Sequence, residues 1–121
     1  MKALVISSLA PDFAGCALAD VSDPIRQPGQ VLIRVRAASL NFPDLLMTEG
    51  KYQLRPDLPF VPGMEVAGEI VATDADSGFA IGDAVVAGTR LGGFAELVAV
   101  DARSVRAMPA NLDFAHAAGV G

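Results

Sequence analysis

The 121-residue sequence contains a single cysteine, no tryptophan and only one tyrosine. One cysteine excludes an intramolecular disulfide, which fits a reducing, cytoplasmic compartment. No stretch approaches the roughly 18 to 20 continuous apolar residues that a membrane span requires, so we expect no membrane partner. Nine basic residues against fourteen acidic ones give a net charge of -5. Because the basic residues are also scattered, nucleic acid is not expected as a partner.

The N-terminal segment allows two interpretations. Lys2 followed by the apolar residues Ala3 to Ala10, with Phe13-Ala14-Gly15-Cys16 beyond them, faintly resembles a lipoprotein signal segment. Pro11 interrupts the apolar region, and Ala3-Leu4-Val5-Ile6 fits a first β-strand equally well. We therefore expect a strand at 3–6 in a cytoplasmic protein, with secretion as the alternative.

Short aliphatic segments separated by turns make up most of the chain. Apolar residues account for 52% of it, with 12 glycines and 8 prolines, which is typical of a small β domain. In the clearest strand, 31–37, the residues Val31, Ile33, Val35 and Ala37 are predicted to share one face. Glycine at position 68 predicts a bulge or a close backbone approach. Further strands are predicted at 65–73, 84–87, 94–100 and 105–108, a spacing that indicates a small barrel or sandwich.

Two short helices are predicted, at 43–49 and 113–118. The first begins with a proline, which suits an early helical position, and Gly50 follows it as a stop signal. The second has Asn111 or Asp113 as its N-cap. The fold class is therefore mainly β with short helices.

Three segments, in this order, resemble the N-terminal domain of the medium-chain dehydrogenase/reductase superfamily. They are VLIRV at 31–35 with ASLNFPD at 38–44, then LPFVPGMEVAG at 58–68, then GDAV at 82–85. The resemblance implies a GroES-like, partly open β-barrel over residues 1–112. It also implies that residues 113–121 begin the linker toward a nucleotide-binding domain, and that this Rossmann domain is absent from the chain.

Two positions separate the chain from the zinc alcohol dehydrogenases of that superfamily. Those enzymes supply a cysteine ligand where this sequence has Asn41, and a histidine where it has Met64. An amide and a thioether are poor ligands for zinc, which prefers thiolate, imidazole or carboxylate. A four-cysteine structural zinc lobe also cannot form with one cysteine. We therefore expect no metal.

The pattern Asn41-Phe42-Pro43-Asp44, followed by Gly50-Lys51-Tyr52, resembles the zinc-free quinone oxidoreductase branch. This resemblance implies hydride transfer from NADPH to a quinone or a conjugated carbonyl, with NADP(H) bound mainly by the other domain. Without a metal, hydrogen-bond donors must stabilise the charge that develops on the acceptor oxygen. Asn41 and Tyr52 can donate such bonds. The implied site has Asn41, Tyr52 and Asp44 as catalytic residues, Asn41 also beside the cofactor, and Met64, Leu46 and Phe42 against the substrate.

Each of these residues has a structural alternative. Asn41 also fits as the N-cap of the predicted helix, and Tyr52 as a loop aromatic that packs on a proline. Asp44 fits as a first-turn carboxylate favoured by the helix dipole. Met64 fits as the filler of a core gap. His116, on the second helix, is expected on the surface.

Other functions also stay open. An enoyl reductase acting on acyl thioesters would need the same hydride delivery to a conjugated carbonyl. A stand-alone GroES-like binding or assembly module is a different class; it would use segment 50–61 as a mobile loop, although prolines stiffen that segment. Gly119-Val120-Gly121 is not read as a phosphate loop, because it follows a helix rather than a strand. The 121-residue chain alone is expected to be inactive, and a homodimer is expected for the intact protein.

Overall fold

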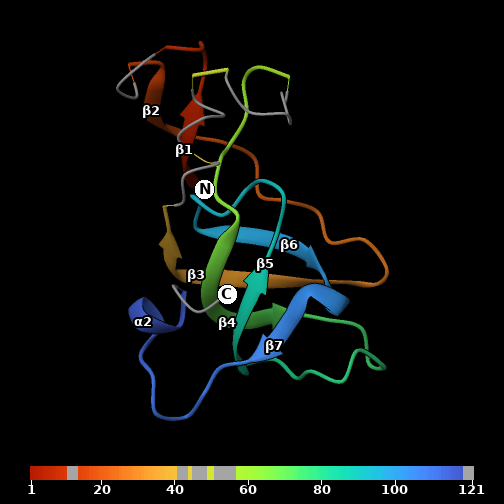
Figure 1. Ribbon diagram of the computed structural model, residues 1–121. Helices are drawn as coiled ribbons and strands as arrows, with labels where there is room; N and C mark the ends of the chain where they lie inside the picture. The colour runs from red at the N-terminus through yellow and green to blue at the C-terminus, as the bar shows by residue number, and fades with distance from the viewer. Residues whose placement is uncertain (11–13, 41–43, 45–48, 51–56, 119–121) are drawn as a thin grey trace.

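The computed structural model describes residues 1–10, 14–40, 44, 49–50 and 57–118. These residues form a two-stranded sheet and a five-stranded sheet, both antiparallel (Figure 1). In the smaller sheet, β1 (Lys2–Ile6) pairs with β2 (Cys16–Asp20). The larger sheet has the order β6-β3-β4-β5-β7. Its strands are β3 (Gln30–Ser39), β4 (Glu65–Ala72), β5 (Ala84–Gly88), β6 (Leu97–Asp101) and β7 (Val105–Ala107).

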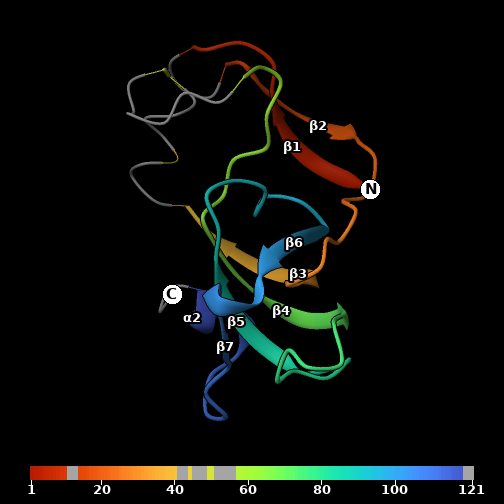
Figure 2. The same cartoon turned by 90° about the vertical axis from the view of Figure 1, so that its right-hand side faces the viewer.

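The mainly β fold class is confirmed. Figure 2 shows the β1–β2 pair at one end of the molecule, separate from the larger sheet. Within the described part of the chain, the edge strands β6 and β7 do not pair with each other, so the larger sheet stays open. The isolated bridges Ala3–Ala95 and Ile6–Phe60 tie β1 to segments outside the named strands. Strand β2 was not predicted from the sequence.

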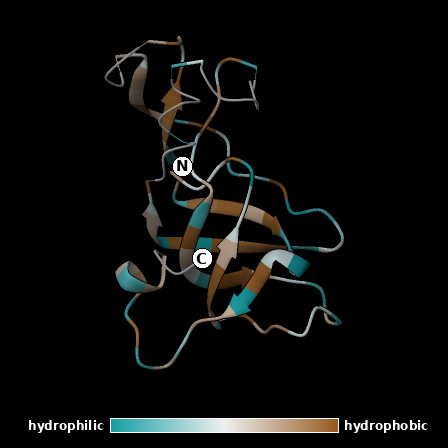
Figure 3. Cartoon of the chain, viewed as in Figure 1, coloured by the Kyte–Doolittle hydropathy of each residue, from teal (hydrophilic) through white to brown (hydrophobic). Residues whose placement is uncertain are grey.

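The main core is built from small aliphatic side chains on the inner face of the larger sheet. Burying a valine or isoleucine side chain contributes roughly 1.5 to 3 kcal/mol relative to exposure. Figure 3 shows that hydrophobic residues gather in the strands, most clearly in β6. The buried members of this cluster are Val31, Ile33, Val66, Ile70, Val85, Ala87, Val98, Val100 and Val105.

One predicted detail of β3 is wrong. The register against β4 shifts between Val35 and Ala37, and a shift of one residue turns every later side chain to the other face. As a result Ala38, not Ala37, packs against the main core, while Ala37 packs against a second cluster. The predicted close approach at Gly68 is confirmed, because a Cβ there would collide with the backbone carbonyl oxygen of Arg34.

The second predicted helix is confirmed as α2 (Phe114–Ala118). Asp113 is its N-cap, and one carboxylate oxygen accepts a hydrogen bond from the His116 backbone N–H at 2.8 Å. That bond, and the His116 ring at 2.7 Å, lower the pKa of Asp113. The His116 side chain is exposed, as predicted. Among the described residues, no helix has both the length and the apolar character needed to cross a membrane.

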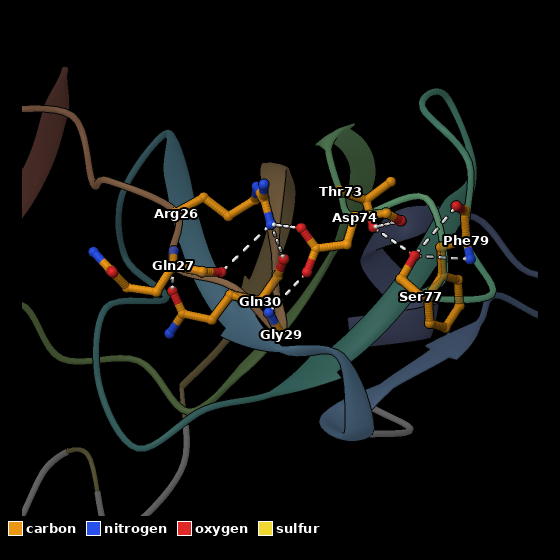
Figure 4. Close-up of polar contacts among 8 residues, drawn as sticks. All are labelled: Arg26, Gln27, Gly29, Gln30, Thr73, Asp74, Ser77 and Phe79. Atoms are coloured by element: carbon orange, nitrogen blue, oxygen red, sulfur yellow. Dashed lines mark hydrogen bonds and ion pairs between the residues drawn. The ribbon is translucent and has the colours of Figure 1, made fainter.

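At the end of the larger sheet where β3 begins and β4 ends, charged contacts join two loops (Figure 4). The Arg26 guanidinium lies 2.7 Å from one Asp74 carboxylate oxygen, and the Gly29 N–H donates to the other at 2.8 Å. The hydrogen bond from Gly29 and that from Arg26 hold the pKa of Asp74 below its ordinary value. On the same β4–β5 loop, the Ser77 hydroxyl accepts from Thr73 and from the Phe79 N–H.

Candidate functional site

The opposite end of the larger sheet brings the two predicted site segments together. Ser39, the last residue of β3, pairs in register with Glu65, the first residue of β4, although they lie 26 residues apart in the sequence. Asn41 follows Ser39 by two residues, and Met64 directly precedes Glu65. The segments that carry Asn41 and Met64 therefore leave the sheet from neighbouring strand ends.

Asp44 is a predicted catalytic residue that the structure describes, and its side chain is buried. Its side chain is 0% exposed. A carboxylate enclosed in this way needs polar partners inside the protein, because desolvation of a charge is costly. Its burial suits orientation of the surrounding segment better than direct contact with a substrate. This orienting role is one that the resemblance implied, and it stays a prediction.

Met64 is half-buried and packs against the small cluster formed by Ile6 and Phe60. Its carbonyl oxygen accepts a hydrogen bond from the Thr89 N–H at 2.8 Å, which fixes the backbone at this position. Cys16 packs against the same cluster, and burial raises the pKa of its thiol. The core-filling alternative for Met64 is thus supported. A half-buried side chain can also present its remaining surface to a ligand.

Gly63 sets the path of the backbone into Met64. Its φ of +113° lies in a region that only glycine adopts readily. A Cβ at this position would lie 2.6 Å from the Phe94 amide nitrogen and 2.8 Å from the Gly93 Cα. The Gly93 N–H also donates to the Gly63 carbonyl at 3.0 Å. Close packing of two glycine-bearing segments therefore requires a glycine at position 63.

Ser39 is a residue at this end of the sheet that the sequence analysis missed. Its hydroxyl donates a hydrogen bond to the carbonyl oxygen of Ala118 at 3.1 Å and lies 3.4 Å from a Glu65 carboxylate oxygen. A hydroxyl has one proton to donate, and the contact to Ala118 is the shorter of the two. No spacing rule links a serine at a strand end to a residue near the other end of the sequence, so the sequence held no signal for this contact.

The remaining predicted site residues lie outside the described residues: Asn41, Phe42, Leu46 and Tyr52. The helix predicted at 43–49 falls mostly in the same undescribed stretch. Among the residues that the structure does describe, no three side chains of His, Cys, Asp or Glu lie close enough together to hold a metal ion.

The open antiparallel sheet, with two motif segments converging at one end, has the features expected of a GroES-like domain of the medium-chain type. Residues 27–110 match the family model of the alcohol dehydrogenase GroES-like domain. The chain belongs to this family, as the motifs predicted.

Known proteins similar to the chain include several oxidoreductases. It is 36% identical to a quinone oxidoreductase of Lama guanicoe over 123 residues, covering 100% of this chain and 37% of that protein. A solved structure of a probable oxidoreductase from Mycobacterium abscessus matches 99% of this chain and 38% of that chain, with a TM-score of 0.96 and 42% identity.

The quinone oxidoreductase of Thermus thermophilus, solved with and without NADPH, matches 98% of this chain and 36% of that chain. Its TM-score is 0.81 and its identity 37%. The predicted resemblance to quinone oxidoreductases is thus confirmed. The chain spans little more than a third of the length of these relatives.

Proposed function

We propose that this chain is the substrate-side domain of a zinc-independent, NADPH-dependent oxidoreductase that transfers hydride to a quinone or a conjugated carbonyl. Residues 1–112 form that domain, and residues 113–121 begin the linker to a nucleotide-binding domain. The proposal is supported by the similarity of nearly the whole chain to the Thermus quinone oxidoreductase, which has also been solved with NADPH.

The chemistry of the chain's own residues adds to this support. Bound NADPH would supply the hydride. The acceptor oxygen gains negative charge as hydride arrives, and donors placed in advance lower the barrier most effectively. In the proposed site, the Asn41 amide and the Tyr52 hydroxyl donate hydrogen bonds to that oxygen, and Asp44 orients the segment that carries Asn41. Met64, Leu46 and Phe42 form an apolar wall against a flat acceptor.

We propose a site without zinc because the side chains at the two ligand positions are poor zinc ligands. Met64 precedes Glu65 at the start of β4 and offers a thioether, while Asn41 offers an amide. Neither is a ligand that zinc prefers. The polarisation that a metal would give to a carbonyl is therefore assigned to the hydrogen-bond donors.

The proposal is tested by following NADPH oxidation with the full-length protein and a panel of acceptors. The panel contains a 1,4-quinone, an α,β-unsaturated ketone and an enoyl thioester. We expect turnover of the quinone and the ketone, and no turnover by the 121-residue chain alone. Turnover of the thioester only would instead support an enoyl reductase, and activity of the 121-residue chain alone would overturn the division into two domains.

Two further elements belong to the proposal: a location, inferred from the single cysteine, and a state of assembly, implied by the resemblance. The protein is proposed to act in the cytoplasm and to form a homodimer. Light scattering of the full-length protein measures its mass directly, and a monomer would contradict the second element. A ring of many subunits would instead favour an assembly module.

A further inference from the structure

The C-terminal end of α2 is buried against the larger sheet. Ala117 is 0% exposed and Ala118 2% exposed, and both belong to a cluster with Ala67 of β4 and Val86 of β5. The last carbonyl groups of a helix lack partners within the helix, and a buried carbonyl without a donor is costly. The Ser39 hydroxyl supplies a donor to the Ala118 carbonyl at 3.1 Å.

The position of Ser39 joins three parts of the chain. It ends β3, it faces Glu65 at the start of β4, and its hydroxyl holds the last residue of α2. The same hydroxyl lies 3.4 Å from the Glu65 carboxylate, next to Met64. In the sequence, Ser39 stands two residues before Asn41. One polar side chain thus lies where the two site segments meet the helix that leads toward residue 121.

We propose that Ser39 is a positioning residue that fixes the site end of β3 and β4 relative to α2. The inference rests on the proposed function. In that function, the donors on this domain must be aligned with a cofactor held by another domain. A misplacement of about 1 Å at a reacting centre can lower a rate by as much as roughly a hundredfold. The contact from Ser39 to Ala118 sets this alignment, because it joins α2 to the strand end beside the site.

The sharpest test compares two substitutions of nearly equal shape in the full-length protein. Ser39→Thr keeps the hydroxyl, and Ser39→Val replaces it with a methyl group while suiting a strand. We expect Ser39→Val to lower kcat for quinone reduction about tenfold with KM nearly unchanged, and Ser39→Thr to stay within about threefold of the wild type. Equal kcat values for the two variants would overturn the inference.

Ser77→Ala serves as the matched control. Ser77 also makes partly buried hydrogen bonds, to Thr73 and Phe79, but on the β4–β5 loop at the other end of the sheet. A general loss of stability would affect Ser77→Ala and Ser39→Val alike. We expect the control to keep its kcat within about twofold. A drop in kcat equal to that of Ser39→Val would show that Ser39 acts only through stability.

Hydrogen exchange gives a readout that needs no activity. We expect the backbone amides of residues 113–118 to exchange faster in Ser39→Val than in Ser39→Thr, because the helix loses its contact to β3. Equal protection in the two variants would overturn the inference even if the full-length protein reduces no quinone. Loss of wild-type quinone reduction together with hydroxyl-dependent protection would overturn the proposed function and leave the Ser39 contact standing.

Discussion

The two ends of the five-stranded sheet are held in different ways. Where β3 begins and β4 ends, the Asp74 carboxylate joins two loops through the Arg26 guanidinium and the Gly29 N–H. Where β3 ends and β4 begins, the Ser39 hydroxyl lies within reach of both the Ala118 carbonyl and the Glu65 carboxylate, and the alanines of α2 pack against the sheet. The ion pair at the first end is partly exposed to solvent, whereas the alanines packed at the second end are buried.

This difference indicates a division of tasks within one small domain. Charged contacts close the end that lies away from the predicted site. Among the described residues, the site end is held by small buried side chains, by the close contact of Gly63 with Gly93, and by the Ser39 hydroxyl. We expect substitutions at the Asp74 end to change stability alone. Substitutions at the Ser39 end should change both stability and activity.

Gly68 lies in β4 between the two ends, opposite Val35, and its substitution should have the largest effect. In Gly68→Ala, the new Cβ collides with the Arg34 carbonyl oxygen and approaches the Ile33 side chain to 2.8 Å. We expect a loss of about 3 kcal/mol in the free energy of unfolding, measured by urea denaturation. Both ends should loosen together, since β3 and β4 connect them.

The matched control is Gly88→Ala in β5. There, the nearest atom to a new Cβ is the Met64 carbonyl oxygen at 3.9 Å, an ordinary contact distance. We expect a change within about 0.5 kcal/mol. Equal destabilisation by the two variants would refute the close approach of β3 and β4 at Gly68.

A substitution at Ala117 tests how α2 packs at the site end of the sheet. Ala117→Leu adds three carbon atoms to a side chain that is 0% exposed and packed against Ala67 and Val86. We expect a loss of about 2 kcal/mol in the free energy of unfolding and faster amide exchange in α2. Ala115→Leu, on the exposed side of the same helix, is the control and should change stability by less than about 0.5 kcal/mol. A harmless Ala117→Leu would mean that α2 does not dock as described.

Asp74 tests the charged end, with the smallest expected effect because its contacts are partly exposed to solvent. Hydrogen bonds from Gly29 and Arg26 lower the folded-state pKa of Asp74 below 3.8. The resulting stability is therefore fully present above that pH and is lost as the pH falls through the folded-state pKa. We expect Asp74→Asn to lower the Tm at pH 7, and the difference from the wild type to shrink below about pH 4.

Asp76→Asn, on the same loop, removes an exposed carboxylate and is the control for charge alone. Its Tm should follow that of the wild type at both pH values. A Tm difference for Asp74→Asn that stays constant as the pH falls would contradict an electrostatic role for the contact.

The strands whose signals are local were predictable from the sequence. Strand β3 shows alternating apolar residues up to Val35, and Gly68 marked the point where the backbones approach. The N-cap at Asp113 also follows from local residue chemistry. These features depend on a few neighbouring residues, and the structure confirms them.

The features that depend on distant pairing were not predictable. Strand β2, Cys16–Asp20, has no β-branched residue and no alternation of apolar and polar residues, and it forms only because β1 offers an edge. The register shift after Val35 is set by β4. The contact from Ser39 to Ala118 joins residues 79 positions apart. At the site, the sequence indicated Asn41 and Met64 but held no signal for Ser39.

The most direct test of the central claim is quinone-dependent NADPH oxidation by the full-length protein after exhaustive chelation, with the zinc content of the same sample measured. We predict that activity is unchanged by chelation and that zinc is far below one ion per chain, because Asn41 and Met64 stand where zinc enzymes supply ligands. Activity that disappears with the metal and returns when zinc is added back would contradict the account.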